Sequence, residues 1–295
     1  MTKIIYSLYI DIPEDELDWC IPYHGETESK SLKTKREMKK YYSWLKEMHM
    51  RYADSIDVDY KLFEYDDDFK TYKKWFLDKY PMISSYNIVN FYKIHLMYEL
   101  GKKYDEILYL DFDAVPVSNK NFFEAWDLSK GITILTNRSH IDTSLHKLKV
   151  REQRGYTGSV RSPTAKYWNC RALLLDSNMS GTNNVYNTGI VGINRDYLQR
   201  LNYWEDFDNI LVDMKRLIEE EDSMFPRHIQ NIFGYDNETI WSYRMEMNNL
   251  TPQLLTEDWH HFMDKWNYIP CNTNIVHVIN KNFEFVKDWY EKNNL

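Results

Sequence analysis

The sequence predicts an α/β protein in which a mostly parallel β-sheet is flanked by helices. Short apolar stretches rich in β-branched residues alternate with longer amphipathic stretches along the 295 residues. Residues 107–110 form a continuous apolar run, which is typical of a strand buried in the centre of a sheet. Hydrophobic residues make up 43% of the chain, enough for a sizeable core. This alternation favours helices that cover both faces of one sheet.

The N-terminal elements follow from hydrophobic periodicity. Residues 4–12 are apolar and β-branched and are followed by a proline, as expected for a first strand. Residues 31–53 carry apolar side chains near helical spacing among many lysines, which predicts a long amphipathic helix. A second strand is expected at 58–65, followed by an acidic turn. Residues 86–100 have one apolar helical face, and the glycine after them is a natural helix end.

The middle of the chain contains an irregular segment between strands. After the buried run, another strand is expected at 132–136. Residues 139–181 are polar, rich in arginine and poorly periodic, and we interpret them as an insertion that could act as a mobile lid. Strand character returns at 185–194. We therefore expect one domain over residues 1–295, with an insertion at approximately 139–181.

The C-terminal part is expected to be mainly helical. Residues 197–221 are mostly helical in pattern, and Asp236 is placed to cap a helix over 237–248. A late short strand is expected at 275–279. The last helix is expected at 283–292.

Charge and composition limit the classes of partner. The net charge of −8 argues against nucleic acid, because phosphate backbones are bound by basic surfaces. A nucleotide held through a cation is compatible with it, since the metal supplies the positive charge. No apolar run approaches the length of a membrane span, and Cys20, Cys170 and Cys271 show no metal-binding spacing. We expect a soluble, cytoplasmic protein without a signal peptide or membrane anchor, and aromatic surfaces that could support a homodimer.

Asp111 and Asp113 directly follow the buried run, at the strand end where ligands bind in open α/β sheets. Alternate side chains of an extended backbone share a face, so both carboxylates can point into one crevice while Phe112 points back into the core. A divalent cation between them would bridge to a diphosphate and neutralise charge on a departing nucleotide. The simpler alternative is an acidic turn that only ends a strand, because an Asp-x-Asp pair alone is common.

Five blocks of sequence, in a fixed order, resemble a known family. They span residues 92–96, 104–115, 186–191, 236–240 and 275–278. Their order and rough spacing are similar to those of the GT-A glycosyltransferases, and more narrowly of the glycogenin-like family 8 group. The similarity covers about residues 4–280, outside the 139–181 insertion. It implies a GT-A, Rossmann-like sheet.

The resemblance implies a reaction as well as a fold. A hexose or pentose would move from a nucleoside diphosphate sugar to a hydroxyl group of a glycan, protein or small molecule. A uridine nucleotide and retention at the anomeric carbon are implied in the same way. Retaining members of this fold need no obvious general base, because the leaving phosphate can take the acceptor proton.

The resemblance also implies a metal site made of Asp111, Asp113 and His277. One imidazole beside carboxylates and phosphate oxygens suits Mn²⁺, with Mg²⁺ as the alternative. From the sequence alone, a histidine in an apolar strand would more often be a structural residue.

A nucleotide-sugar-binding set and a catalytic set are expected around this metal. Lys93 would reach the nucleotide or its phosphates, although a solvated helix lysine is an equal alternative. Gly189 would let the backbone approach a ligand closely, or would only relieve tight packing in a strand. The expected nucleotide-sugar-binding residues are Tyr9, Asp11, Lys93, Asp111, Phe112, Asp113, Asn187, Thr188, Gly189 and Lys281.

The expected catalytic residues are Asp236, Asn237, Glu238 and Asn187. The acid–amide pair of the family could correspond to Asp236-Asn237 or, with the order exchanged, to Asn237-Glu238. A helix N-cap with an acidic first turn is the alternative, and it needs no ligand.

The segment after the late strand departs from the family pattern. Asn280 stands near the position of the family's glycine, Phe283 stands near that of its lysine, and Lys281 is displaced. The family's phosphate contacts by this glycine and lysine are therefore not reproduced at the same positions, and the insertion is longer than the family pattern implies.

Three other classes of protein are alternatives for this sequence. Residues 110–115 resemble the nucleophile loop of haloacid-dehalogenase-like phosphatases, but that loop follows a first strand, and the downstream metal motif of those enzymes is missing here. A sugar-nucleotide pyrophosphorylase would need a glycine-rich basic loop after its first strand, whereas residues 11–18 are acidic and contain no glycine. The third class is a non-catalytic carbohydrate- or nucleotide-binding protein on a GT-A fold, against which Asp111, Asp113 and His277 argue.

Overall fold

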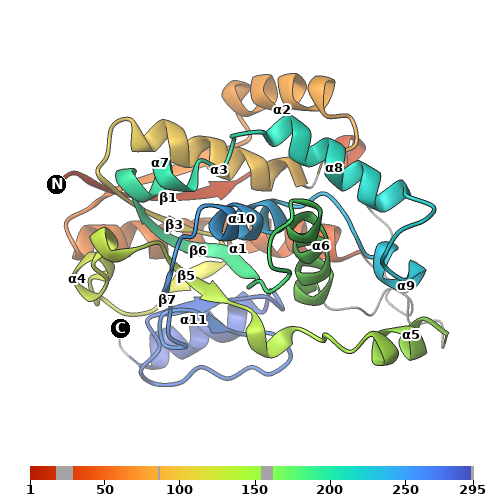
Figure 1. Cartoon of the computed structure of the whole chain (residues 1–295). Coiled ribbons are helices and arrows are strands. Elements are labelled where there is room, and N and C mark those ends of the chain that lie inside the picture. The colour runs from red at the N-terminus through yellow and green to blue at the C-terminus, as the bar shows by residue number, and fades with distance from the viewer. Residues whose placement is uncertain (18–28, 86, 154–161, 294–295) are drawn as a thin grey trace. The chain divides into compact units, whose positions relative to one another are not determined.

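The computed structural model describes residues 1–17, 29–85, 87–153 and 162–293 (Figure 1). The chain divides into two compact units. Unit 1 comprises Met1–Leu135, Thr188–Tyr197 and Pro252–Leu295, and unit 2 comprises Thr136–Asn187 and Leu198–Thr251. Cys20, the expected helix start at Tyr86 and part of the expected insertion, 154–161, lie outside the described residues.

A six-stranded sheet has the strand order β2-β1-β3-β6-β5-β7. Its strands are β1 (Lys3–Tyr9), β2 (Asp59–Glu64), β3 (Glu106–Leu110), β5 (Thr133–Thr136), β6 (Tyr186–Asn194) and β7 (Gln253–Leu254). β1 is parallel to β2 and β3, and β5 is parallel to β7, whereas β3 and β6 are antiparallel. The predicted mostly parallel sheet flanked by helices is therefore confirmed.

Helices α1 (Lys30–Ser55) and α3 (Asn87–Gly101) cover opposite faces of the sheet in unit 1. Successive side chains of a strand alternate between faces. Ile5 of β1 packs in one cluster with Tyr52 of α1, whereas the hydroxyl of the next residue, Tyr6, donates to the Lys93 carbonyl of α3 at 2.8 Å. The other helical segments of this unit are α2 (Asp67–Lys79), α4 (Phe122–Ala125), α11 (Phe283–Lys292) and two short 3₁₀ turns, Glu14–Glu16 and Leu128–Lys130.

A second, three-stranded sheet in unit 1 has the order β4-β9-β8. It consists of β4 (Ala114–Pro116), β8 (His261–Phe262) and β9 (Ile275–His277). β9 is antiparallel to β4, with His277 opposite Ala114, and parallel to β8. This register places His277 beside the segment that follows β3.

The described residues of unit 2 are mainly helical, and they also include the last residue of β5 and the first residues of β6. Its helices are α5 (Leu145–Gln153), α6 (Ser162–Asp176), α8 (Phe207–Glu219), α9 (Arg227–Gln230) and α10 (Asn237–Met247), with a 3₁₀ turn at Arg138–His140. Helix α7 (Arg195–Leu201) begins in unit 1 and ends in unit 2.

The structure corrects the prediction for several elements. The acidic turn expected after the second strand is the start of α2, where Asp66 caps the helix by accepting from the Phe69 amide at 2.9 Å. Residues 139–181 are less irregular than predicted, since they contain α5 and α6. Residues 197–221 are mostly helical, as predicted, and form two helices, because Asn202 and Asp206 between them have left-handed φ values of 43° and 52°. Within the described residues, no helix is long and apolar enough to cross a membrane.

Candidate functional site

Asp111 and Asp113 lie in the short link between β3 and β4. The Asp111 amide donates to the Gly189 carbonyl of β6 at 2.7 Å, and the Asp113 carbonyl accepts from the Val278 amide at 2.9 Å. The link is therefore held on one side by β6 and on the other by the residue that follows β9. Asp113 is buried, whereas 28% of the Asp111 side chain is exposed. Phe112 between them is buried in the core, as predicted.

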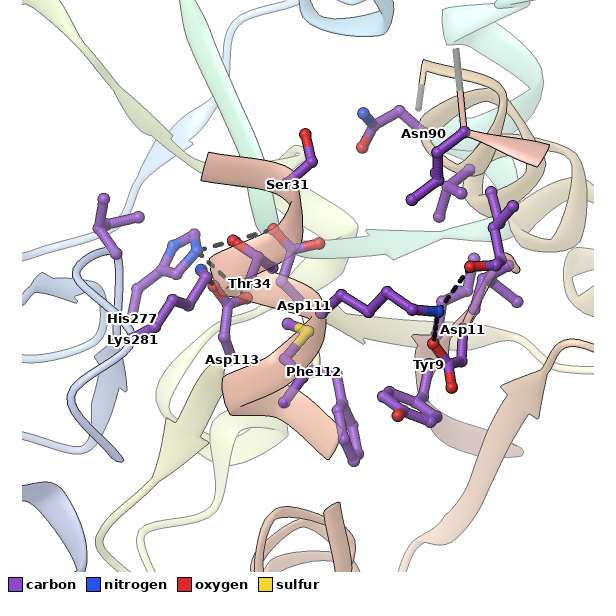
Figure 2. Close-up of a pocket in the computed structure, with 18 of the residues that line it drawn as sticks. Tyr9, Asp11, Ser31, Thr34, Asn90, Asp111, Phe112, Asp113, His277 and Lys281 are labelled. Atoms are coloured by element: carbon purple, nitrogen blue, oxygen red, sulfur yellow. Dashed lines mark hydrogen bonds and ion pairs between the residues drawn. The ribbon is translucent and has the colours of Figure 1, made fainter. Parts of the chain in front are cut away.

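His277 lies beside the two carboxylates because β9 pairs with β4. Its Nε2 lies 3.7 Å from Asp111 Oδ2 and 3.6 Å from Asp113 Oδ1. One ligand atom from each of the three residues lies within 4.8 Å of the others. Figure 2 shows the imidazole directed toward both carboxylates. The structure thus brings together the three residues expected to hold a metal.

This donor set fits a small divalent cation. Mg²⁺ takes oxygen ligands at about 2.1 Å in octahedral geometry, which sets neighbouring ligand atoms about 3.0 Å apart. The separations of 3.6 and 3.7 Å need only a small contraction to reach that value. An imidazole beside two carboxylates also suits Mn²⁺. Three protein ligands leave positions open for a substrate's oxygen atoms.

Each carboxylate also has its own lysine. Lys93 Nζ lies 3.6 Å from Asp111 Oδ1 and donates to the Thr188 carbonyl at 3.1 Å. Lys281 Nζ donates to Asp113 Oδ2. Both lysines are buried, so the alternative of a solvated Lys93 is wrong. Burial alone would raise the pKa of Asp113, but Lys281 and His277 outweigh burial and hold that pKa well below its usual value.

Lys281 reaches Asp113 through an unusual backbone conformation. Its φ is 60°, in the left-handed region, and it follows β9 by four residues. The Lys281 amide donates to the Val278 carbonyl at 3.1 Å, which closes a tight turn. This turn returns the displaced lysine to the acidic pair, a result that spacing along the chain did not reveal.

Tyr109 of β3 contacts Asp111 and Lys93 at the site. It shares a face with Asp111 because the two residues are separated by one, and its hydroxyl donates to Asp111 Oδ1. The Lys93 ammonium lies 4.9 Å from the centre of the Tyr109 ring. Burial and the charge of Asp111 raise the pKa of Tyr109 well above its usual value, so the phenol stays a donor. In the sequence, Tyr109 stands out only as part of an apolar run.

A pocket of about 270 Å³ opens beside the acidic pair and lies within unit 1. Lys35 of α1 lines the pocket, where its ammonium pairs with the Asp11 carboxylate and donates to the Ile12 carbonyl at 2.6 Å. Tyr9, Asp11, Phe112 and Lys281, all expected at a ligand site, line the pocket. The lining residues that the sequence analysis missed include Ser31, Thr34, Lys35, Met38 and Asn90. Asn90 lies one helical turn before Lys93, a spacing that could have identified it.

Thr188 and Gly189 belong to unit 1, and Asn187 belongs to unit 2. Thr188 accepts from Lys93 through its carbonyl, and Gly189 accepts from the Asp111 amide, so both contribute backbone atoms to the acidic site. Asn187 is half-buried at the start of β6.

Asp236, Asn237 and Glu238 lie in unit 2, at the start of α10. Asp236 is the N-cap, as predicted, and accepts from the Thr239 amide at 2.8 Å. Burial raises the pKa of Asp236, although Lys166 and Thr239 oppose that shift. Glu238 pairs with Lys166 of α6. The cap and the ion pair give these acids structural roles that do not depend on a ligand.

Comparison with known proteins finds likeness only among solved structures; no family model and no curated protein sequence matches. The chain is similar to a glycosyltransferase involved in glycosylation of the major capsid of PBCV-1 (11% identity, 97% of this chain and 100% of that chain, TM-score 0.43). It is similar to mouse xyloside xylosyltransferase 1 (10%, 94% and 98%, TM-score 0.45). It is also similar to an active-site mutant of LgtC (11%, 97% and 96%, TM-score 0.42).

Proposed function

We propose that the protein is a metal-dependent glycosyltransferase that moves a sugar from a nucleoside diphosphate sugar to a hydroxyl acceptor. Mn²⁺ or Mg²⁺ would be held by Asp111, Asp113 and His277. The observation that carries the proposal is the convergence of these three side chains, with ligand atoms within 4.8 Å, beside a pocket. The bound ion would act as a Lewis acid toward the donor diphosphate.

The charges of the site support a diphosphate as the ligand. Asp111 and Asp113 balance Lys93 and Lys281, so these four side chains together carry no net charge. A divalent cation would add two positive charges, and a diphosphate that bridges two groups carries about two negative ones. The loaded site would again be near neutral, which matters because Asp113 and both lysines are buried.

The pocket beyond the acidic pair is proposed to take the nucleoside, with uridine as the expected nucleoside. Its volume of about 270 Å³ is near the lower end of the range for small-molecule sites. Tyr9 offers aromatic surface and packs on the buried Phe112, whose ring centre lies 5.3 Å from its own. Asp11 and Lys35, which also line the pocket, offer hydrogen-bonding groups. An apolar wall with few polar groups is what fixes the orientation of a planar base.

The protein residues would contribute mainly by positioning and by charge. Lys93 and Lys281 would stabilise negative charge that develops on the departing nucleotide. The leaving phosphate would take the acceptor proton, in keeping with retention of configuration. Asn187 and one acid–amide pair, either Asp236-Asn237 or Asn237-Glu238, are proposed as the catalytic polar groups.

A donor-hydrolysis assay tests this function. Asp113→Asn removes one ligand charge with little change in shape, and it should abolish Mn²⁺-dependent hydrolysis of UDP-glucose or UDP-galactose. Asp54→Asn, which changes an exposed aspartate of α1 in the same unit, is the matched control and should retain activity. The readout is release of UDP in Mn²⁺ and in EDTA.

The alternatives predict different results in the same experiments. If UDP bound equally well with EDTA, and equally well to Asp113→Asn, the metal bridge would be wrong. Turnover of a phosphomonoester that Asp111→Asn blocks would indicate a phosphatase instead. Nucleotide binding without any sugar transfer or hydrolysis would indicate a non-catalytic binding protein. The anomeric proton signal of a transferred sugar would report retention or inversion.

A further inference from the structure

His260 is a buried histidine beside the candidate metal site. It lies directly before β8, and 2% of its surface is exposed. Its Nε2 is 2.9 Å from Nδ1 of His277, the ring nitrogen that faces away from the carboxylates. Among the described residues, His260 Nδ1 has no hydrogen-bond partner. Within the described residues, the His260 imidazole therefore makes its hydrogen bond through Nε2, to His277.

The bond between the two rings decides which nitrogen of His277 is free. A neutral imidazole carries one N–H and one lone pair. If His260 donates, His277 Nδ1 accepts, and the His277 proton must sit on Nε2, between the two carboxylates. If His260 accepts, His277 carries its proton on Nδ1, and the Nε2 lone pair faces Asp111 and Asp113 at 3.7 and 3.6 Å. Only the second arrangement lets Nε2 bind a cation.

We propose that His260 is a positioning residue for the metal site: it accepts the Nδ1 proton of His277 and so presents Nε2 to a divalent cation. The inference rests on the metal site of the proposed function and adds a residue to it. Histidine ligands of metals usually donate their second N–H to a carboxylate, carbonyl or water, and this outer contact orients the ring. In this chain a second histidine takes that place.

The surrounding structure holds the two rings in this geometry. Their ring centres lie 5.2 Å apart with an interplanar angle of 25°. Phe262 packs against both, at 4.6 Å from the centre of the His260 ring and 5.4 Å from that of His277. The backbone of His277 accepts from the Met263 amide at 2.9 Å, which ties the segment after His260 to β9. The His260 ring therefore has little freedom to rotate away from Nδ1 of His277.

Binding of Mn²⁺ alone, measured by the electron paramagnetic resonance signal of the free ion, tests the proposal. His260→Phe keeps an aromatic ring but removes the acceptor, and it should weaken Mn²⁺ binding by about 10- to 100-fold. His260→Gln keeps a side-chain acceptor and should recover most of the affinity. His261→Phe is the matched control, because the neighbouring His261 contacts the Tyr268 carbonyl and not His277; it should bind as the wild type does.

The outcomes separate this inference from the proposed function. If the wild type binds no Mn²⁺, the metal site itself is wrong and the role of His260 falls with it. If the wild type binds Mn²⁺ and His260→Phe binds it equally well, His260 is a packing residue only and the inference alone is overturned. Equal weakening by His260→Phe and His260→Gln would also overturn it, because loss of the acceptor would then not be the cause.

A measurement on the wild-type protein covers the case in which His260→Phe does not fold. Nitrogen-15 NMR of the Mg²⁺-loaded protein should show the His277 proton on Nδ1, with scalar coupling across the hydrogen bond to His260 Nε2. A proton on Nε2 of His277 in the loaded protein would overturn the proposal.

Discussion

At the scale of single residues, the candidate site is a set of buried charges that balance one another. Asp111 faces Lys93 and Asp113 faces Lys281, with His277 between the two carboxylates. Asp113 and Lys281 are both buried, so neither charge is well solvated by water. Buried pairs of this kind contribute little net stability, but loss of one partner is costly because the other charge stays buried.

Lys281→Met should expose this dependence. The substitution keeps an unbranched side chain but removes the ammonium from Asp113, so the free energy of unfolding in EDTA should fall by about 3 kcal/mol. Mn²⁺ should recover part of the loss, because the ion again sets a positive charge against Asp113. Urea unfolding in EDTA and in Mn²⁺ measures both effects.

A surface lysine provides the control for this substitution. Lys130 pairs with Asp127 at 3.2 Å, and 72% of its side chain is exposed. Lys130→Met should cost less than about 1 kcal/mol and show no added effect of Mn²⁺. A loss in Lys281→Met no larger than in Lys130→Met, or the same loss with and without Mn²⁺, would contradict this account of Asp113.

At the scale of elements, strand β6 carries the backbone that contacts the site. Thr188 and Gly189 accept from Lys93 and from the Asp111 amide, and Leu108 of β3 lies opposite Gly192. Gly192 has no room for a side chain, because an added Cβ would lie 2.5 Å from Phe122 Cε1. Phe122 cannot easily move, since it is fully buried against Trp259.

Gly192→Ala should therefore destabilise the protein by about 1–3 kcal/mol, the usual cost of overpacking a core. Phe122→Leu in the same chain should relieve the clash, so the double variant should be more stable than the sum of the two single changes predicts. Gly234→Ala is the control: no heavy atom lies within 4 Å of its added Cβ, and its stability should change by less than about 1 kcal/mol. Urea unfolding of the five proteins (wild type, two single variants, double variant and Gly234→Ala) measures these stabilities. Strict additivity of the two single changes in the double variant would contradict the clash.

At the scale of the whole molecule, the site is assembled from segments far apart in the chain. The link after β3 supplies the carboxylates, α3 supplies Lys93, and β9 with the turn after it supplies His277 and Lys281. All of these segments belong to unit 1, as does the pocket beside them. A ligand that binds only the folded state stabilises the parts that it contacts.

Hydrogen exchange should therefore change in several separate segments at once. Mn²⁺ should slow amide exchange at 109–115 and 275–281, because both segments contribute to the proposed metal site. UDP with Mn²⁺ should extend the protection to 8–12 and 31–38, which line the pocket. Mass spectrometry of peptides, with Mn²⁺ omitted and EDTA added as the control, measures this. Protection confined to unit 2 would contradict the placement of the nucleotide.

Several features of the site could be predicted because they depend on local sequence. An apolar run followed by Asp111 and Asp113 indicates a strand end, and Asp236 before a helical pattern indicates an N-cap, since both depend only on neighbouring residues. Helix α2 was missed because Asp66 to Asp68 read equally well as a turn and as a helix start. His260 was missed for a different reason: it lies 17 residues before His277, in a segment without periodicity.

By itself, the sequence determined the class of fold, the strand that carries the acidic pair, and the residue types suited to a divalent cation. Only the tertiary structure decided which side chains meet there. The pairing of β9 with β4 brings His277 to the carboxylates, the left-handed turn returns Lys281 to Asp113, and the packing of α3 on the sheet buries Lys93. Periodicity indicates only the local conformation of the backbone. The contacts between these side chains depend on strand register and on one backbone dihedral angle, and both are fixed by contacts across the whole unit.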